Sequence, residues 1–243
     1  MDYYCAMESI VPDWVSETRF GKWFLSTRTW YRYVLTVAVE DLRAIGGSRL
    51  SSIGRLLDVG CGQGRSFGLL AQHFAPREIV GVDIDPVMVA TARRAATGCP
   101  VPVTVLQSSV SKLDLPDGSV DGVFCHQLIH HVSEQARVLR ELHRVLAPGG
   151  YLLLGESCES FIRIWSVRWF FRHPPGVQHP AEGYVRLVRE AGFIVDERDV
   201  RTSTPWWSLA DLGVARKYGL QKKIPPPTEL LLVARKPERP TAL

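Results

Sequence analysis

The sequence predicts an α/β fold, in which helices cover both faces of a mainly parallel sheet. From residue 55 onward, short apolar runs alternate with segments of helical periodicity, as they do in parallel sheets. A glycine-rich turn at 60–64 separates the first apolar run from the first of these helical segments. The chain has 243 residues, 46% of them hydrophobic and 22% charged, which suits one large globular domain rather than two.

A helix is predicted ahead of the sheet, from Trp23 to Ile45. Apolar residues recur there at helical spacing, and Gly46 and Gly47 supply a stop. We therefore expect residues 1–50 to form an N-terminal helical extension that caps the domain.

The expected core elements follow along the chain. The strands are predicted at 56–59, 78–83, 103–107, 120–126, 151–155, 193–200 and 230–234. The helices are predicted at 67–74, 86–96, 133–146 and 181–191. Pro86 suits a first helical turn, 133–146 carries an apolar stripe, and Gly192 closes the last helix. The core domain is expected to span 51–236, followed by a flexible tail at 237–243.

Two insertions, 158–179 and 202–227, interrupt this pattern. Both follow strand ends, where doubly wound folds place substrate contacts. In the first, Phe161, Trp165 and Trp169 fall on one face of a predicted helix. We expect this segment to be a lid over an apolar acceptor pocket, and the alternative is a buried helix with exposed arginines. The further pocket walls that we expect are Trp23, Trp30, Trp206 and Trp207.

Charge and cysteine usage exclude several classes of protein. The formal net charge is only +4, which does not predict the concentrated basic face of a nucleic-acid-binding protein. We find neither a secretory signal nor an apolar stretch long enough to cross a bilayer. The cysteines form no C-x-x-C pair, which disfavours a disulfide framework or a zinc cluster; they are Cys5, Cys61, Cys99, Cys125 and Cys158. We therefore expect a cytoplasmic protein with no metal.

The glycine turn is the strongest functional signal. Gly60, Gly62 and Gly64 allow the backbone to turn tightly and approach a ligand, although such a turn alone is weak evidence. Asp83 ends the second predicted strand about twenty residues later, where a carboxylate can bind ribose hydroxyls. Asp58 opens the turn and could hold an ammonium group. The G-x-G-x-x-G spacing of dinucleotide-binding folds is absent.

With these motifs the chain resembles the class I S-adenosylmethionine-dependent methyltransferases of small-molecule type. The motif at 58–64 matches the family's acidic residue and glycine turn, and 82–86 matches its acidic end of strand two. The segments 115–121, 128–132 and 139–150 are similar to later signatures. The resemblance implies a Rossmann-like fold of seven strands with an antiparallel last strand, and S-adenosylmethionine as cofactor.

The resemblance also implies the positions that bind the cofactor. Many members carry an acidic residue after strand three, where this chain has Ser109, whose hydroxyl can still accept a hydrogen bond. The expected cofactor-binding residues are Asp58, Gly60, Cys61, Gly62, Gln63, Gly64, Asp83, Ile84, Met88, Ser109, Val110 and His126.

Catalysis needs few residues, because in-line methyl transfer depends mainly on alignment. A hydroxyl acceptor would need a base, and histidine has a suitable pKa. We rank His131 first, because related enzymes place a functional histidine there, followed by His130, His126 and then Glu156, which is predicted just past strand five. The alternative is that the paired histidines only cap or pack the next helix. Cys61 and Cys125 are interpreted as packing residues.

The sequence thus favours methyl transfer to a small, lipophilic or aromatic acceptor. A membrane-surface enzyme acting on a lipid or quinone, with peripheral membrane contact, is a variant of this hypothesis. The rivals are a cofactor-binding protein that does not transfer methyl, such as a cyclase or an interaction module, and, with less support, a nucleic-acid methyltransferase. No pattern predicts an oligomeric state.

Overall fold

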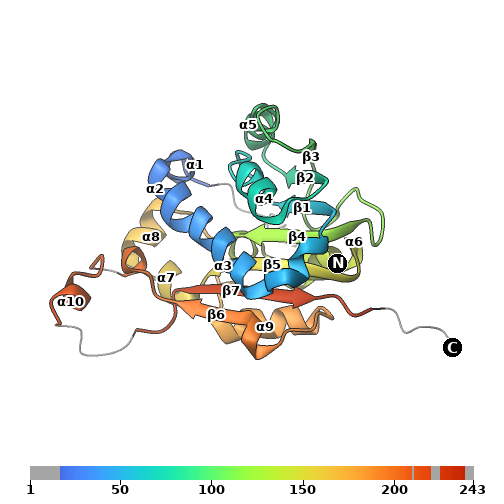
Figure 1. Ribbon diagram of the computed structural model, residues 1–243. Coiled ribbons are helices and arrows are strands. Elements are labelled where there is room, and N and C mark those ends of the chain that lie inside the picture. Colours follow the sequence, from blue (N-terminus) through green and yellow to red (C-terminus); the bar gives the residue numbers. More distant parts are fainter. Residues whose placement is uncertain (1–16, 210, 220–224, 239–243) are drawn as a thin grey trace, which may run out of the picture.

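The computed structural model describes residues 17–209, 211–219 and 225–238, and in them one sheet has the order β3-β2-β1-β4-β5-β7-β6 (Figure 1). Strands β1 to β5 pair in parallel, and β7 runs antiparallel to both of its neighbours. This confirms the mainly parallel sheet with an antiparallel last strand. The strands are β1 Arg55–Val59, β2 Glu78–Asp83, β3 Val103–Gln107, β4 Val120–His126, β5 Leu146–Ser157, β6 Val200–Ser203 and β7 Glu229–Arg235.

Helices cover both faces of this sheet, as predicted. One buried cluster joins α3, α4 and α5 to the sheet, and a second joins α6 and α9 to its other face. The α-helices are α1 Arg19–Ser26, α2 Arg28–Trp30, α3 Thr36–Gly46, α4 Phe67–Phe74, α5 Pro86–Ala96, α6 Gln135–Val145, α7 Glu159–Ile162, α8 Trp165–Phe170, α9 Ala181–Glu190 and α10 Val214–Lys217. The short η elements are η1 Tyr31–Leu35, η2 Gly47–Ser52, η3 Ile129–His131, η4 Glu197–Asp199 and η5 Trp206–Ser208. No helix in the described ranges is long and apolar enough to cross a membrane.

The single helix predicted from Trp23 to Ile45 is wrong, because Thr27 breaks it. Thr27 is extended (φ −73°, ψ 153°), and its hydroxyl donates to the Phe24 carbonyl and accepts from the Trp30 amide. It therefore ends α1 and caps α2, as threonine does at helix starts. The π-turn η1 then leads into α3. The break lets α1 leave the axis of α3. Of the extension expected at 1–50, residues 17–50 are described, and most of these are helical.

The sixth strand is also displaced from its predicted position at 193–200. Ile194 forms only an isolated bridge with Arg235, and residues 197–199 form the turn η4. Phe193 and Val195 are both buried, which produces a strand-like alternation without a strand. Buried Asp199 holds the turn through an ion pair with Arg49 (2.8 Å). Pairing with β7 begins only at Val200.

The boundary between α6 and β5 is earlier than predicted. The helix ends at Val145, and Leu146 already pairs with Val120 of β4. β5 is therefore twelve residues long and includes Glu156, which was expected just past the strand. The sheet sets this boundary, because pairing with β4 satisfies the backbone of Leu146.

The insertion at 158–179 is not one helix. Ile164 is extended (φ −61°, ψ 131°) and separates α7 from α8. Phe161 packs against Trp207, whereas Trp165 and Trp169 are 70% and 77% exposed. The predicted common face of these three aromatic residues is therefore wrong. Of the expected tail at 237–243, residues 239–243 lie outside the described part of the chain, as does Cys5.

Candidate cofactor and acceptor site

The glycine turn after β1 adopts a conformation that suits glycine. Gly60, Gly62 and Gly64 have φ values of 68°, 52° and 73°. A Cβ on Gly62 would come no closer than 4.0 Å to another atom, so the space above it is open. A Cβ on Gly64 would lie 2.6 Å from the Phe67 ring and 3.0 Å from Ala92 Cα. Gly62 therefore borders open space, and Gly64 lets α4 pack closely.

Asp83 at the end of β2 is tied to this turn. Its Oδ2 accepts a hydrogen bond from the Gly62 amide, and its Oδ1 accepts one from the Asp85 amide, both at 2.9 Å. Burial raises the pKa of Asp83, and these amide bonds oppose the shift. Each carboxylate oxygen has a second lone pair, so the group can still accept hydrogen bonds from two hydroxyls.

Two adjoining cavities lie around the turn, and Leu25, Gly60, Gly62 and Gln127 line both of them. The larger has a volume of about 160 Å³ and the smaller about 90 Å³. The predicted residues that line the larger one are Gly60, Gly62, Asp83, Ile84, Met88, Ser109, Val110 and His131. Those that line the smaller one are Asp58, Gly60, Cys61, Gly62, Gln63 and His126. The fold thus brings together every predicted cofactor residue except Gly64.

The cavities differ in a way that fits S-adenosylmethionine. Ile84, Met88 and Val110 give the larger one apolar walls beside the Asp83 carboxylate, as an adenosine needs. Asp58 is the acid of the smaller one, where its carboxylate is buried and bonded to the Ser66 hydroxyl. Burial raises the pKa of Asp58 to about 7. A nearby ammonium would oppose that shift and favour the ionised form.

Ser109, in the position where an acidic residue is common, points its hydroxyl at a neighbour. Ser109 Oγ lies 2.8 Å from Ser111 Oγ and accepts from the Ser111 amide (3.2 Å). Both serines line the larger cavity. A pair of hydroxyls thus stands where the family often has a carboxylate.

His126, at the end of β4, is enclosed by aromatic rings. Its ring stacks on Phe124 (centroids 5.8 Å apart) and is tilted against Trp30 (6.1 Å). Burial lowers the pKa of His126 to about 3, so the imidazole is neutral at pH 7. Trp30 is the expected wall residue that lines the cofactor cavities, whereas Trp23 is exposed and Trp206 and Trp207 line a separate open groove of about 1030 Å³.

His130 is held by Glu156 of β5, a contact that the sequence did not reveal. Glu156 Oε1 accepts from the amides of Leu128 (3.0 Å) and Ile129 (2.7 Å), and Oε2 lies 2.5 Å from His130 Nδ1. Both side chains are buried. Glu156 thus secures the turn η3, and neither of these two residues lines the cavities.

His131, the next residue, faces the larger cavity. Its Nδ1 is buried and makes no hydrogen bond in the described part of the chain. Burial lowers the pKa of His131 well below its ordinary value, and the neighbouring His130 and His173 add to this shift. The ring therefore offers an unprotonated nitrogen near the open space.

A cover over the larger cavity was also missed from the sequence. The Thr18 hydroxyl donates to the Phe170 carbonyl (2.6 Å), and the Arg172 amide donates to Glu17 Oε1 (3.0 Å). Phe20 packs on Phe170, with ring centroids 4.7 Å apart. These contacts join the start of α1 to the segment after α8.

The middle of α1 is fixed to the residues that follow β1 and β2. Lys22 Nζ pairs with Asp85 Oδ2 (2.5 Å), and Gln63 Nε2 donates to the Lys22 carbonyl (3.1 Å). Glu17, Lys22 and Leu25 all line the larger cavity. Lys22 and Leu25 lie on α1, which is a separate helix because the chain breaks at Thr27. The apolar periodicity of the segment did not reveal this break.

Comparison with known proteins finds methyltransferases among the similar chains. A family model described as a methyltransferase domain matches residues 57–154. An uncharacterized 37.1 kDa protein in transposon Tn4556 of Streptomyces fradiae is 36% identical over 150 residues, 61% of this chain and 40% of that protein. A demethylmenaquinone methyltransferase of Thermus thermophilus is 36% identical over 102 residues, 42% of this chain and 46% of that one. The matched regions thus span less than half of either relative.

A solved structure is similar over more of the chain. The crystal structure of the cyclase SpnF has a TM-score of 0.60 and 25% identity, and the match covers 82% of this chain and 81% of that one. The sheet order, the glycine turn and the acidic end of β2 define a Rossmann-like nucleoside-binding domain. The match over residues 57–154 and the named relatives identify this part of the chain as a class I S-adenosylmethionine-dependent methyltransferase domain, and S-adenosylmethionine is the cofactor of that family.

Proposed function

We propose that this chain transfers a methyl group from S-adenosylmethionine to a small, lipophilic acceptor. The observation that carries the proposal is the pair of adjoining cavities, of which Asp83 lines the larger, Asp58 the smaller and Gly62 both. Asp83 would bind the ribose hydroxyls, and Asp58 the amino group of the methionine part. When bound, S-adenosylmethionine supplies an electrophilic methyl group on a sulfonium.

The acceptor side is supported by the apolar lining of the larger cavity. Leu25, Leu128 and Val132 surround His131 there. Such walls exclude water and hold an apolar acceptor in line with the methyl group, which is the main requirement of the reaction. One relative is named as a demethylmenaquinone methyltransferase, which agrees with a small-molecule acceptor.

His131 is our candidate for the base that takes the proton of a hydroxyl acceptor. It lines the cavity, and its buried Nδ1 has no hydrogen-bond partner in the described residues. Its lowered pKa keeps the ring unprotonated at neutral pH. His130 and His126 would shape the site rather than take a proton. Glu156 holds His130, and aromatic rings enclose His126.

Calorimetry with S-adenosylhomocysteine tests the donor site. Asp83→Asn keeps an oxygen that can accept a hydrogen bond but removes the charge, and hydrogen bonds to charged groups are about 1.5 kcal/mol stronger than neutral ones. We expect about tenfold weaker binding in this variant. Asp114→Ala, which removes an exposed acid outside both cavities, should bind like the wild type. Equal affinity in all three proteins would contradict the assignment of Asp83.

A protein that binds the cofactor without transferring methyl is the second candidate, and the similarity to the cyclase SpnF favours it. Mass spectrometry of reactions with candidate quinones and phenols separates the two. Methyl transfer yields a product heavier by one methylene together with S-adenosylhomocysteine, whereas a cyclase-like protein leaves the donor unchanged.

A membrane surface is the place where a lipophilic acceptor would be met. The exposed Trp165 and Trp169 of α8 support this proposal, together with the exposed Arg168 between them. Aromatic and basic side chains of this kind bind at the interface of anionic bilayers. The contact would lie on the helix whose end is hydrogen-bonded to the start of α1.

A further inference from the structure

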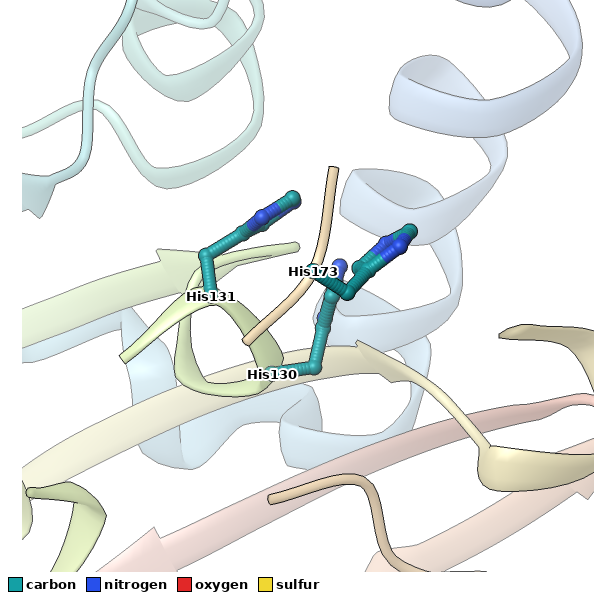
Figure 2. Close-up of side chains that lie close together, drawn as sticks. All are labelled: His130, His131 and His173. Carbon is teal, nitrogen blue, oxygen red and sulfur yellow. The ribbon is translucent and has the colours of Figure 1, made fainter. Parts of the chain in front are cut away.

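Three imidazole rings gather beside the larger cavity, from segments far apart in the sequence. His130 and His131 lie in η3 after β4, and His173 follows α8. One nitrogen of each ring lies within 4.8 Å of one nitrogen of the other two. Figure 2 shows the three side chains projecting into the same region, with ring centroids 4.3 to 5.3 Å apart.

His130 is oriented as metal ligands usually are. Its Nδ1 is bonded to Glu156 Oε2 at 2.5 Å, so Nε2 is the nitrogen left for another partner. A carboxylate on the second ring nitrogen fixes the orientation of a metal-binding histidine and makes it a better ligand. Glu156 is itself fixed by the amides of Leu128 and Ile129.

His131 offers a ring nitrogen that makes no hydrogen bond in the described part of the chain. This nitrogen is Nδ1, and it is buried. An unprotonated imidazole nitrogen without a hydrogen-bond partner is the form of histidine that binds metal ions.

The charges around the cluster favour a cation. Glu17 interacts electrostatically with His130, and its Oε2 is buried without a hydrogen-bond partner among the described residues. With Glu156 this places two carboxyl groups near the three rings. Arg172, the neighbouring basic residue, is exposed and so largely screened by water.

We propose that His130, His131 and His173 form a binding site for one divalent transition-metal ion of the zinc class. Imidazole nitrogens suit Zn²⁺ and its neighbours in the first transition series. Three protein ligands leave a fourth position, which would open toward the larger cavity that His131 lines. Cysteine spacing predicts no metal site, and histidine spacing does not reveal this one because His173 is 42 residues from His131 in the chain.

Binding requires a small rearrangement. Zn–N bonds of about 2.0–2.1 Å place tetrahedral ligand nitrogens about 3.3 Å apart, closer than the present limit of 4.8 Å. The rings of His131 and His173 are stacked at 15°, and both must turn toward a common point. Such rotation is available because His173 lies in a connecting segment rather than in a helix.

The site would share His131 with the proposed methyl transfer. A metal ion and a proton compete for the same lone pair, so a loaded protein would present the ion, rather than a free imidazole, to the acceptor. The metal site can nevertheless be tested without donor or acceptor. Its failure would leave the proposed function in place, and the reverse also holds.

The experiment is a Zn²⁺ titration of tag-free, chelator-stripped protein against a chromophoric chelator. We expect one Zn²⁺ per chain in the wild type. His131→Ala and His173→Ala should each weaken binding about 100-fold or more, since losing a ligand costs more than the 10- to 100-fold of an outer partner. His73→Ala removes an imidazole outside the cluster and should leave affinity unchanged.

Cobalt gives an independent signature. Co²⁺ added to the wild type should produce the visible absorption of a low-coordinate nitrogen site, and His173→Ala should lose it. S-adenosylhomocysteine binding and circular dichroism establish that each variant is folded. If His173→Ala does not fold, His173→Asn replaces it. Two results would overturn the site. One is a stoichiometry on the order of background, below about 0.5 Zn²⁺ per chain, in folded wild type. The other is equal affinity in wild type and the folded His173 variant.

Discussion

At the scale of single residues, one carboxylate, that of Asp83, combines two tasks. It accepts the Gly62 and Asp85 amides and so holds the glycine turn against the end of β2. The same group is our proposed ligand for ribose. A substitution at this position therefore changes both the shape of the turn and its affinity for the donor, which is why asparagine is a better test than alanine.

His131→Ala separates catalysis from donor binding. General-base removal typically costs about 10²- to 10⁴-fold in rate, so we expect a loss of kcat in that range with a hydroxyl acceptor. S-adenosylhomocysteine should still bind, because Asp83 and Asp58 are untouched. Because the pKa of His131 is lowered, the wild-type rate should begin to fall only well below pH 6.5. A wild-type kcat retained by the variant would remove His131 from the chemistry, with His73→Ala as the matched control.

The candidate site was predictable where its residues are neighbours in sequence. The turn at 58–64 and the acid at 83 form local motifs, and the fold places them beside the cavities. The contact of His130 with Glu156 was not predictable, because it depends on the register of β4 and β5. Glu17 was missed for a similar reason, since its position depends on packing against the segment after α8.

At the scale of elements, α1 forms part of the wall of the larger cavity, through Lys22 and Leu25. Each cavity is smaller than the roughly 300 Å³ at which ligand pockets usually begin. We therefore expect α1 or the segment after α8 to move when the donor binds. A hydrogen bond from Thr18 to Phe170 holds the start of α1, and a partly exposed ion pair joins Lys22, in the middle of α1, to Asp85.

Lys22→Ala should weaken the attachment of α1 to the residues around Asp85. Ion pairs of this exposure contribute about 0.2–1 kcal/mol, so amide exchange across 19–26 should accelerate up to about fivefold. Dissociation of S-adenosylhomocysteine should accelerate by a similar factor. Arg137→Ala, which breaks an exposed pair with Glu134 on α6, is the control and should change neither rate. Unaltered exchange in Lys22→Ala would show that the ion pair does not restrain α1.

The helix α8 gives a second prediction at this scale. Trp165→Ser with Trp169→Ser should lower partitioning onto anionic liposomes at least tenfold, because burying two large aromatic side chains is worth more than about 1.4 kcal/mol. Trp206→Ser removes another exposed tryptophan, at 53% exposure, and serves as the control. Flotation that is equally weak for all three proteins would argue against membrane contact through α8.

The elements themselves were predictable where local signals agreed with tertiary packing. The bounds of α4, α5, β2, β3 and β4 match the prediction, and each has a clear apolar pattern. The errors occurred where packing or a single side chain overrode the pattern. Thr27 capped a new helix inside a periodic run, and burial of Phe193 and Val195 imitated a strand.

At the scale of the whole molecule, buried histidines make stability depend on pH. The pKa of His126 is about 3 in the fold and about 6.5 in the unfolded chain. As pH falls below 6.5, the unfolded chain binds a proton that the folded chain does not, and stability is lost until about pH 3. At pH 5 this amounts to about 2 kcal/mol.

The variant His126→Gln removes this term. Urea denaturation at pH 7 and pH 5 should show that the wild type loses about 2 kcal/mol more than the variant over this interval. Comparing the two proteins cancels the opposite contribution of Asp58 and Glu229, acids whose pKa values burial raises to about 7. Parallel pH dependences of the two proteins would mean that His126 is readily protonated in the folded state.

The strand order separates the two halves of the proposed reaction. Asp58 and Asp83 lie on β1 and β2, whereas the histidines and the segment after α8 are carried by the other half of the sheet, beyond the crossover between β1 and β4. An enzyme built in this way can exchange one substrate for another without disturbing its grip on the methyl donor. Grafting residues 158–179 from a relative would then be the shortest route to a new acceptor preference on an intact donor-binding frame.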